Sequence, residues 1–148
     1  MERTLVLIKP DAVVKGISGL ILFELEQANL KMIGLKIVNV KKDLAEKHYE
    51  KLREKPFFEN LINHLIGSFH NNSNVIAIVY EGENAIQKIR NLTGKTFPDD
   101  AEFCSIRGRY GRHNQKTDCV ENVIHTSDSP ESAKKEISLW FDDSELIK

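Results

Sequence analysis

Four short apolar runs recur along the chain and predict β-strands. They lie at residues 5–8, 31–40, 75–80 and 120–124 and are rich in Val, Ile and Leu. The first run is apolar at every position and stops at a Lys-Pro-Asp turn. In the second run, the alternation predicts that Ile33, Leu35 and Ile37 share one face of the strand. The pattern therefore favours a sheet of four strands.

Between and beside these strands, apolar residues recur at the three- and four-residue spacing of amphipathic helices. The predicted helices cover residues 16–29, 43–54, 56–67, 83–92 and a last segment that begins at Pro130. Proline suits the first turn of a helix, which supports starts at Pro56 and Pro130. In the last helix, Ala133, Ile137 and Trp140 form the predicted buried stripe. Residues 95–119 show no regular period.

The order of these elements predicts the fold class. Four strands with helices between or beside them indicate one sheet covered on one face by helices, an α+β sandwich. The length of 148 residues and the lack of a linker or repeat predict a single domain over residues 1–148. The irregular segment 95–119 is longer than an ordinary connection, and loops of that length are usually functional or disordered.

Composition excludes some classes of protein and leaves others open. The formal net charge is −1, which argues against nucleic acid as the primary partner. Residues 107–116 nevertheless form a locally basic segment, which is either a solvated loop or an anion site. The cysteines, Cys104 and Cys119, fit no disulfide framework or zinc motif, so we expect free thiols in a reducing compartment. The first apolar run is too short for a signal peptide or membrane span, so we expect a cytoplasmic protein.

A histidine placed between a strand and a helix is the first candidate for chemistry. The segment ENVIHTSDSPESAKKEISLWF, residues 121–141, places His125 at the predicted end of the last strand. A histidine nucleophile needs one free ring nitrogen and an acceptor that orients the ring through the other. Glu136, in the following helix, is the candidate acceptor, and Ser127 could orient it in turn. The alternatives are an ordinary loop histidine and a solvent-facing Glu136 paired with a neighbouring lysine.

Cationic residues in separate elements suggest a site for phosphates. Lys9 ends the first strand, Arg90 lies on the helix at residues 83–92, and Arg107 lies in the long irregular segment, with Thr96 as a further polar candidate. Neither glycine-rich phosphate-binding motif, G-x-x-x-x-G-K-[ST] or G-x-G-x-x-G, is present, so side chains would have to hold any nucleotide. Taken singly, Lys-Pro-Asp is a common turn, and the Pro-Phe-Phe segment at Phe57 is typical of a core.

Together, these segments resemble one family over essentially the whole chain. NVIHTSDS, at residues 122–129, resembles the active-site histidine signature of nucleoside diphosphate kinases. LIKPD, HYEKLREKPFF, IRG and SAKKEISLWF follow the order found in that family. The resemblance implies a ferredoxin-like α/β sandwich with a four-stranded antiparallel sheet covered by helices. It also implies ping-pong transfer of the γ-phosphate from a nucleoside triphosphate, such as ATP or GTP, to a nucleoside diphosphate.

The resemblance assigns a role to each matching residue. His125 would carry the phosphoryl group and Glu136 would bond its other ring nitrogen. Lys9, Tyr49 and Asn122 would contact the sugar hydroxyls or the reacting centre. The residues holding the phosphates would be Arg90, Thr96 and Arg107, with Mg²⁺ bound mainly through the phosphates and no metal ligand from the protein. The base would stack on Phe57 beside Leu61, which predicts little discrimination between bases because every base has a π-face.

Several features depart from the family pattern. Thr126 follows the histidine where Gly or Ala is usual, and its branched side chain is expected to crowd a phosphohistidine. Segments 67–73 and 111–119 are longer than usual, so Arg112 and Cys119 are candidate nucleotide contacts without an assigned role. We expect a homo-oligomer, with tetramer and hexamer both open. The rival hypotheses are an inactive nucleotide-binding relative and a nucleic-acid-binding protein that uses residues 107–116.

Overall fold

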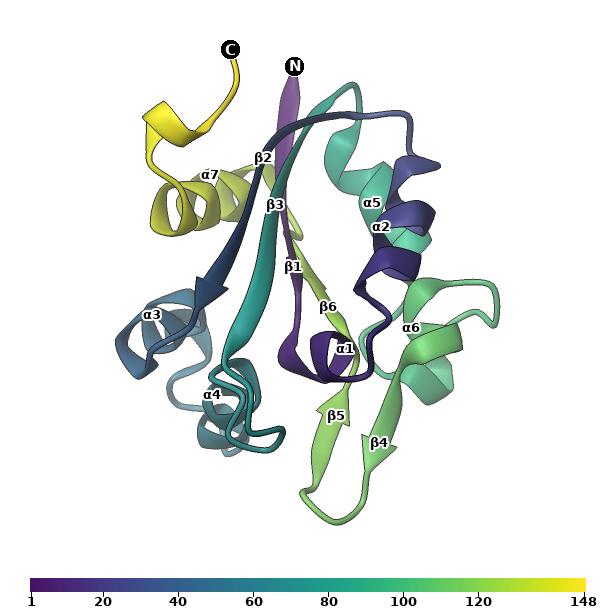
Figure 1. Ribbon diagram of the computed structural model, residues 1–148, viewed down its shortest axis with the longest axis vertical. Coiled ribbons are helices and arrows are strands. Elements are labelled where there is room, and N and C mark those ends of the chain that lie inside the picture. Colours follow the sequence, from purple (N-terminus) through teal and green to yellow (C-terminus); the bar gives the residue numbers. More distant parts are fainter.

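The computed structural model describes residues 1–148 and is built on a four-stranded sheet with the strand order β2-β3-β1-β6 (Figure 1). The central strands are β1 (Glu2–Ile8) and β3 (Asn74–Gly82), and the edge strands are β2 (Lys31–Asn39) and β6 (Ile124–Thr126). Every pairing is antiparallel. This topology, with helices packed on the sheet, confirms the predicted ferredoxin-like α+β fold.

Seven α-helices accompany the sheet. They are α1 (Pro10–Val14), α2 (Ser18–Glu26), α3 (Lys42–His48), α4 (Phe58–Leu65), α5 (Ala85–Thr93), α6 (Ile106–Tyr110) and α7 (Pro130–Trp140). Short 3₁₀ helices cover Glu50–Leu52, Pro98–Asp100 and Asp143–Glu145. The predicted start of the last helix is correct: Pro130 occupies its first turn and the Ser129 side chain accepts the Ser132 N–H. None of the helices combines the length and apolar composition needed to span a bilayer.

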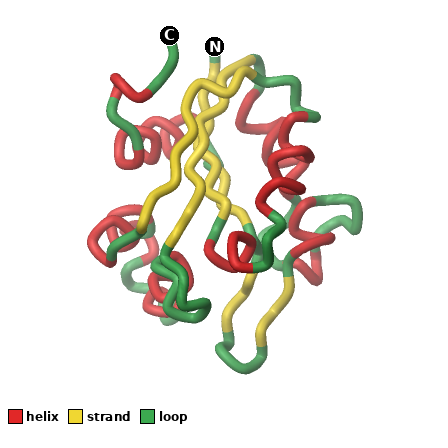
Figure 2. The backbone as a smooth tube through the Cα atoms, in the orientation of Figure 1, coloured by secondary structure: helices red, strands yellow, loops and turns green.

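Helices cover both faces of the sheet, so the prediction of one covered face is wrong. Leu5 and Leu7 pack into a cluster with residues of α3, α4 and α7, whereas Val6 and Ile8 pack into a second cluster with residues of α2, α5 and α6. Figures 1 and 2 show the two groups of helices on opposite sides of the strands. The physical reason lies in the sequence itself: because successive side chains of a strand point to opposite faces, an unbroken apolar run requires cover on both.

A bulge in β2 overturns the prediction that Ile33 shares a face with Leu35 and Ile37. The pairing register with β3 shifts between Met32 and Gly34, which turns Ile33 into the core. Leu35 and Ile37 are instead 54% and 71% exposed. β2 is an edge strand, so these two side chains form an apolar strip at the rim of the sheet.

The predicted strand at residues 120–124 is two strands, separated by a backbone turn. β5 (Cys119–Glu121) pairs with β4 (Arg112–Asn114) in a separate hairpin, and β6 pairs with β1. Val123 between them has φ of 61°, a conformation that β-branched residues rarely adopt. His125 is therefore the middle residue of β6 and not the end of a strand.

Two other predicted boundaries are also wrong. The helix predicted at 43–54 ends at His48, where Tyr49 caps it and a 3₁₀ turn follows. The segment 95–119 contains α6 and the strand β4, which were too short to give a detectable period.

Candidate active site

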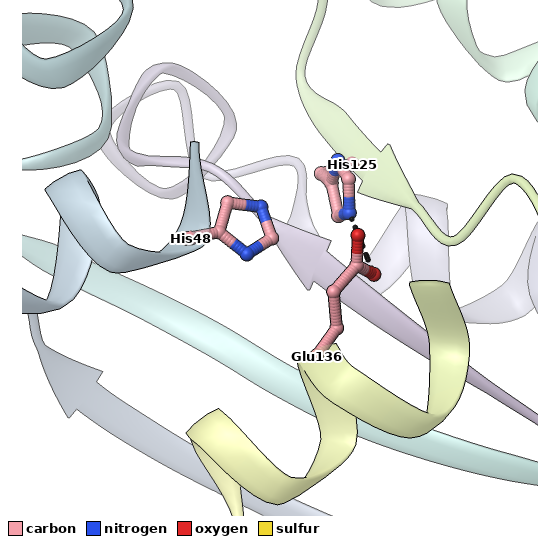
Figure 3. Close-up of side chains that lie close together, drawn as sticks. All are labelled: His48, His125 and Glu136. Atoms are coloured by element: carbon pink, nitrogen blue, oxygen red, sulfur yellow. Dashed lines mark hydrogen bonds and ion pairs between the residues drawn. The ribbon is translucent and has the colours of Figure 1, made fainter. Parts of the chain in front are cut away.

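His125 and Glu136 meet in the folded chain, although they lie in different elements. The Nε2 atom of His125 lies 3.1 Å from Oε2 of Glu136 on α7 (Figure 3). The Ser127 hydroxyl donates to the same oxygen over 2.7 Å. The two side chains are 19% and 14% exposed, so the pair lies partly open to solvent. Lys135, which could have paired with Glu136, bonds to Glu50 instead. The geometry thus favours an oriented histidine over a loop histidine.

The pairing of β6 with β1 sets the direction of the His125 side chain. His125 lies opposite Leu7, whose side chain belongs to the cluster under α3, α4 and α7. Thr126 lies opposite Val6 and therefore points to the other face of the sheet, where it is buried. The expectation that Thr126 crowds a group on His125 is therefore not supported by the strand geometry.

A chain of hydrogen bonds joins Lys9, Asn122 and Thr96. The Lys9 ammonium donates to Oδ1 of Asn122 over 2.7 Å, and the Asn122 amide donates to the carbonyl of Thr96 over 3.0 Å. Burial lowers the pKa of Lys9 to about 8, and the charge of Arg107 acts in the same direction. The structure thus brings together the end of β1, the turn before β6 and the loop after α5.

Arg107 is the residue of the basic segment that reaches this region. Its guanidinium donates to the carbonyls of Gly94, over 3.1 Å, and Ile124, over 2.9 Å. Burial lowers its pKa to about 10, which leaves it charged at neutral pH, and the neighbouring charge of Arg90 also lowers it. Arg90 itself is exposed on α5.

Most of the remaining basic side chains in the segment are paired with carboxylates. Arg109 pairs with Glu24, Arg112 with Glu121 and His113 with Asp118. The segment 107–116 therefore presents no continuous basic surface, which argues against the nucleic-acid-binding hypothesis. Arg112, one of the candidate nucleotide contacts, forms an ion pair with the buried carboxylate of Glu121.

Aromatic rings border His125 on the side of α3. Tyr49 is buried, its ring centroid lies 6.3 Å from that of His125, and burial raises its pKa. The ring of His48 is nearer, with its centroid 4.4 Å from that of His125. Sequence reasoning gave His48 no chemical role, because its position in a helical period does not distinguish it from a packing residue.

The predicted base-binding residues lie apart from this cluster. Phe57 precedes α4 and is 50% exposed, and Leu61 follows one turn later on the same helix. Leu61 packs against the core cluster that contains Tyr49. No hydrogen bond or ring contact joins Phe57 to the residues around His125, so the structure leaves it as an open apolar ring at the surface.

A second histidine–carboxylate pair lies in the interior. Nε2 of His64 on α4 lies 3.0 Å from Oδ1 of Asp11, and its Nδ1 lies 2.6 Å from the sulfur of Cys119. The other oxygen of Asp11 accepts the Val123 N–H over 3.0 Å. Cys119 is thus buried and engaged, and it is not an open nucleotide contact. Sequence reasoning missed this network; a histidine within the apolar residues of α4 was the one available signal.

The family model of nucleoside diphosphate kinases matches residues 2–146. The chain belongs to the nucleoside diphosphate kinase family. Its members are phosphotransferases, and the chain is therefore an enzyme of that class. The nucleoside diphosphate kinase of Pyrococcus horikoshii is 46% identical over 147 residues, covering 99% of this chain and 89% of the relative. That of Synechococcus sp. is 44% identical over 147 residues, covering 99% and 92%.

Solved nucleoside diphosphate kinases share the fold throughout. The enzyme of Aquifex aeolicus has a TM-score of 0.88 and 37% identity, covering 99% of both chains. The enzyme of Halobacterium salinarum in complex with CDP has a TM-score of 0.88 and 39% identity, covering 99% of this chain and 91% of the other. A transition-state mimic of the Borrelia burgdorferi enzyme, with bound vanadate and ADP, has a TM-score of 0.88 and 33% identity, covering 99% of this chain and 90% of the other.

Proposed function

We propose that His125 carries the phosphoryl group during exchange between nucleoside triphosphates and nucleoside diphosphates. The observation that carries the proposal is the unequal use of its two ring nitrogens. Nε2 is bonded to Glu136, whereas no protein group bonds to Nδ1. An Nε2–H donor leaves the lone pair on Nδ1, which is the requirement for a nucleophile.

The first half-reaction forms a nitrogen–phosphorus bond. The Nδ1 lone pair attacks the γ-phosphorus, the bond from phosphorus to the β–γ bridging oxygen breaks, and the nucleoside diphosphate leaves with that oxygen. As the bond forms, positive charge develops on the imidazole, and the carboxylate of Glu136 stabilises it. In the second half-reaction, a terminal oxygen of another nucleoside diphosphate attacks the phosphorus, and the bond to Nδ1 breaks.

Phosphoryl transfer depends mainly on positioning and on cations around the transferred group. We assign Lys9, Arg90, Thr96 and Arg107 to the phosphates, and Tyr49 and Asn122, with Lys9, to the sugar hydroxyls or the reacting centre. The bond from Lys9 to Asn122 supports a shared task for these two residues. The neighbouring charges of Arg90 and Arg107 support a common anionic ligand, because an anion between them relieves their repulsion.

The side chains of the site fit Mg²⁺ that binds as a complex with the nucleotide. Oε2 of Glu136 already accepts from His125 and Ser127, and both oxygens of Asp11 are bonded, so these oxygens are engaged within the protein. The ion would therefore be held mainly through the phosphates, which Lys9, Arg90 and Arg107 would hold in turn. When bound, Mg²⁺ would neutralise part of the phosphate charge.

Base binding is assigned to the exposed ring of Phe57, with Leu61 beside it. Stacking is tolerant of sequence because each base offers a π-face. We expect kcat/KM for purine and pyrimidine diphosphates to differ by less than about a hundredfold, or ~2.7 kcal/mol. Steady-state kinetics with the four common diphosphates would check this, and a larger difference would require side chains that read base edges.

We also propose that the enzyme is a single-domain cytoplasmic protein that forms a homo-oligomer. The free thiols Cys104 and Cys119 support a reducing compartment. The exposed apolar side chains of Leu35 and Ile37 on an edge strand support contact with another copy. A measured mass in solution would distinguish tetramer, hexamer and monomer.

The test of the proposed function is the capture of the phosphorylated intermediate. The protein is mixed with ATP labelled in the γ-phosphate and Mg²⁺, and the protein-bound label is measured. We expect about one acid-labile, base-stable phosphate per chain, removed on addition of a nucleoside diphosphate and mapped by mass spectrometry to His125. Nucleotide binding without labelling would instead indicate the inactive, nucleotide-binding relative.

A further inference from the structure

The ring of His48 lies between the nucleophile and the single tryptophan of the chain. Its centroid is 4.4 Å from that of His125 and 5.6 Å from that of Trp140, and it meets both rings edge to face, at 83° and 87°. Nδ1 of His48 accepts the indole N–H of Trp140 over 3.1 Å. Nε2 is inaccessible to solvent and has no hydrogen-bond partner. A buried polar atom without a partner requires an explanation.

The hydrogen bond from Trp140 fixes the tautomer of His48. An indole N–H can only donate, so Nδ1 of His48 must carry a lone pair and Nε2 must carry the proton. Burial lowers the pKa of His48 well below its ordinary value, and the nearby His125 and Lys9 lower it further, so the ring is neutral. Figure 3 shows the edge of the ring that carries Nε2 turned toward His125.

This tautomer excludes a metal ion as the partner of Nε2. His48, His125 and Glu136 each place a potential ligand atom within 4.8 Å of the others, which by distance alone suggests a metal site. A metal needs a lone pair on the ligating nitrogen, and in His48 that lone pair is on Nδ1. His48 therefore offers an N–H donor to this site and not a ligand.

We propose that His48 is a further positioning residue of the phosphotransfer reaction, whose Nε2–H edge, fixed by Trp140, packs against the ring of His125 and keeps that ring oriented for attack. The inference rests on the proposed function of His125. The face of an aromatic ring is negative and its edge is positive, so the face of the His125 ring attracts the N–H edge of His48 and the contact restrains the ring. Glu136 holds His125 through Nε2 from one direction, and His48 restrains the same ring from another.

Two amide substitutions separate this role from simple packing. The amide of Asn can replace Nδ1 as acceptor for Trp140 but is too short to present a donor at the position of Nε2, whereas Gln can place an N–H near that position. In single-turnover labelling with saturating ATP and Mg²⁺, we expect His48→Asn to slow phosphorylation of His125 about tenfold, an effect typical of residues that orient a reacting group. We expect His48→Gln to stay within about threefold of wild type. ATP binding should be unchanged in both.

The separation of rate from binding gives a readout that a merely structural role would not move. The N–H edge acts on the ring of His125 and not on the nucleotide, so the labelling rate at saturating ATP should fall in His48→Asn and not in His48→Gln, while the Kd for ATP stays unchanged in both. Trp140→Phe, which frees the tautomer of His48, should produce the same effect with a smaller loss of rate.

The outcomes are distinguishable from failure of the proposed function. If wild type takes up no phosphate on His125, the proposed function fails. If wild type is labelled and His48→Asn matches it in rate, the inference is wrong. It is also wrong if Asn and Gln slow labelling equally, or if the loss appears only as weaker ATP binding, because His48 would then only support packing.

Discussion

Two of the histidine–carboxylate pairs in the molecule have similar lengths and different characters. His125 and Glu136 are 3.1 Å apart with side chains 19% and 14% exposed, whereas His64 and Asp11 are 3.0 Å apart with side chains 4% and 0% exposed. In His125 one ring nitrogen is bonded within the protein. In His64 both are, to Asp11 and to Cys119.

This difference shows that a carboxylate partner does not by itself make a histidine a nucleophile. What matters is a second nitrogen that carries a lone pair and can be reached by a substrate. In the His64 pair the second nitrogen is bonded to Cys119 and buried, so no substrate can reach it, and the position of the pair suggests another task. Asp11 also accepts the N–H of Val123, the residue with strained backbone directly before Ile124 and His125. The interior pair therefore stabilises the turn that leads to the exposed one.

The largest expected effect is on the exposed pair. His125→Gln removes the ring that attacks phosphorus, and we expect phosphotransfer to fall by at least about a thousandfold, or ~4 kcal/mol. Folding should be unaffected, because the ring contributes one hydrogen bond at a partly open site. Turnover and circular dichroism of the purified variant check both statements, and substantial remaining turnover would exclude His125 as the nucleophile.

Substitution in the interior pair should lower the free energy of unfolding. His64→Leu leaves the buried carboxylate of Asp11 without its imidazole partner, and breaking such a pair typically costs about 3–5 kcal/mol of unfolding free energy. Urea unfolding measures this cost. His113→Leu is the matched control, because the His113–Asp118 pair is exposed and should contribute less than about 1 kcal/mol. Equal effects of the two substitutions would contradict a structural role for His64.

Glu136→Ala tests the carboxylate of the exposed pair. The rate of phosphotransfer should fall about ten- to a hundredfold, because the ring of His125 loses its orientation. Nucleoside diphosphate binding, measured by calorimetry, should change little because Arg90 and Arg107 are untouched. A variant that binds nucleotide poorly but is phosphorylated at the normal rate when saturated would make Glu136 a structural residue of α7.

The smallest expected effect is on the pH dependence of stability. Burial lowers the pKa of His64 in the folded state, so below the ordinary value of about 6.5 the unfolded chain binds a proton that the folded chain resists. Unfolding free energy should therefore decrease as pH falls below about 6.5, with a slope up to ~1.4 kcal/mol per pH unit for this group. His48, with its pKa also lowered, adds to the slope.

The pKa of Asp11 is lowered as well, and its contribution has a different pH window. A depressed carboxyl pKa stabilises the fold above the unfolded value and loses that contribution as pH falls through the folded value. Urea titrations from pH 7.5 to 5.5 thus separate the histidines from Asp11. We expect a shallower slope in His64→Leu than in the wild type, and an equal slope in the two proteins would contradict the assignment.

Local pattern predicted most of the elements and several partners within the site. Residues 5–8 and 75–80 were recognised as strands because their apolar runs are unbroken, and the last helix was recognised from its period and its proline. The pairing of His125 with Glu136 was predicted from residues in one continuous segment, and the structure brings them together. In these cases the residues that determine the structure lie close together in the sequence, or the apolar character of each residue is itself the signal.

Tertiary contacts decided what local pattern could not. The strand at 120–124 breaks at Val123, whose N–H is bound by Asp11 from 112 residues away. The tautomer of His48 depends on Trp140, 92 residues distant, and the basic segment is neutralised in part by Glu24, 85 residues from Arg109. Which side of a ring carries its proton, and which charges remain free for a substrate, depend on partners that only the folded chain brings within hydrogen-bonding distance.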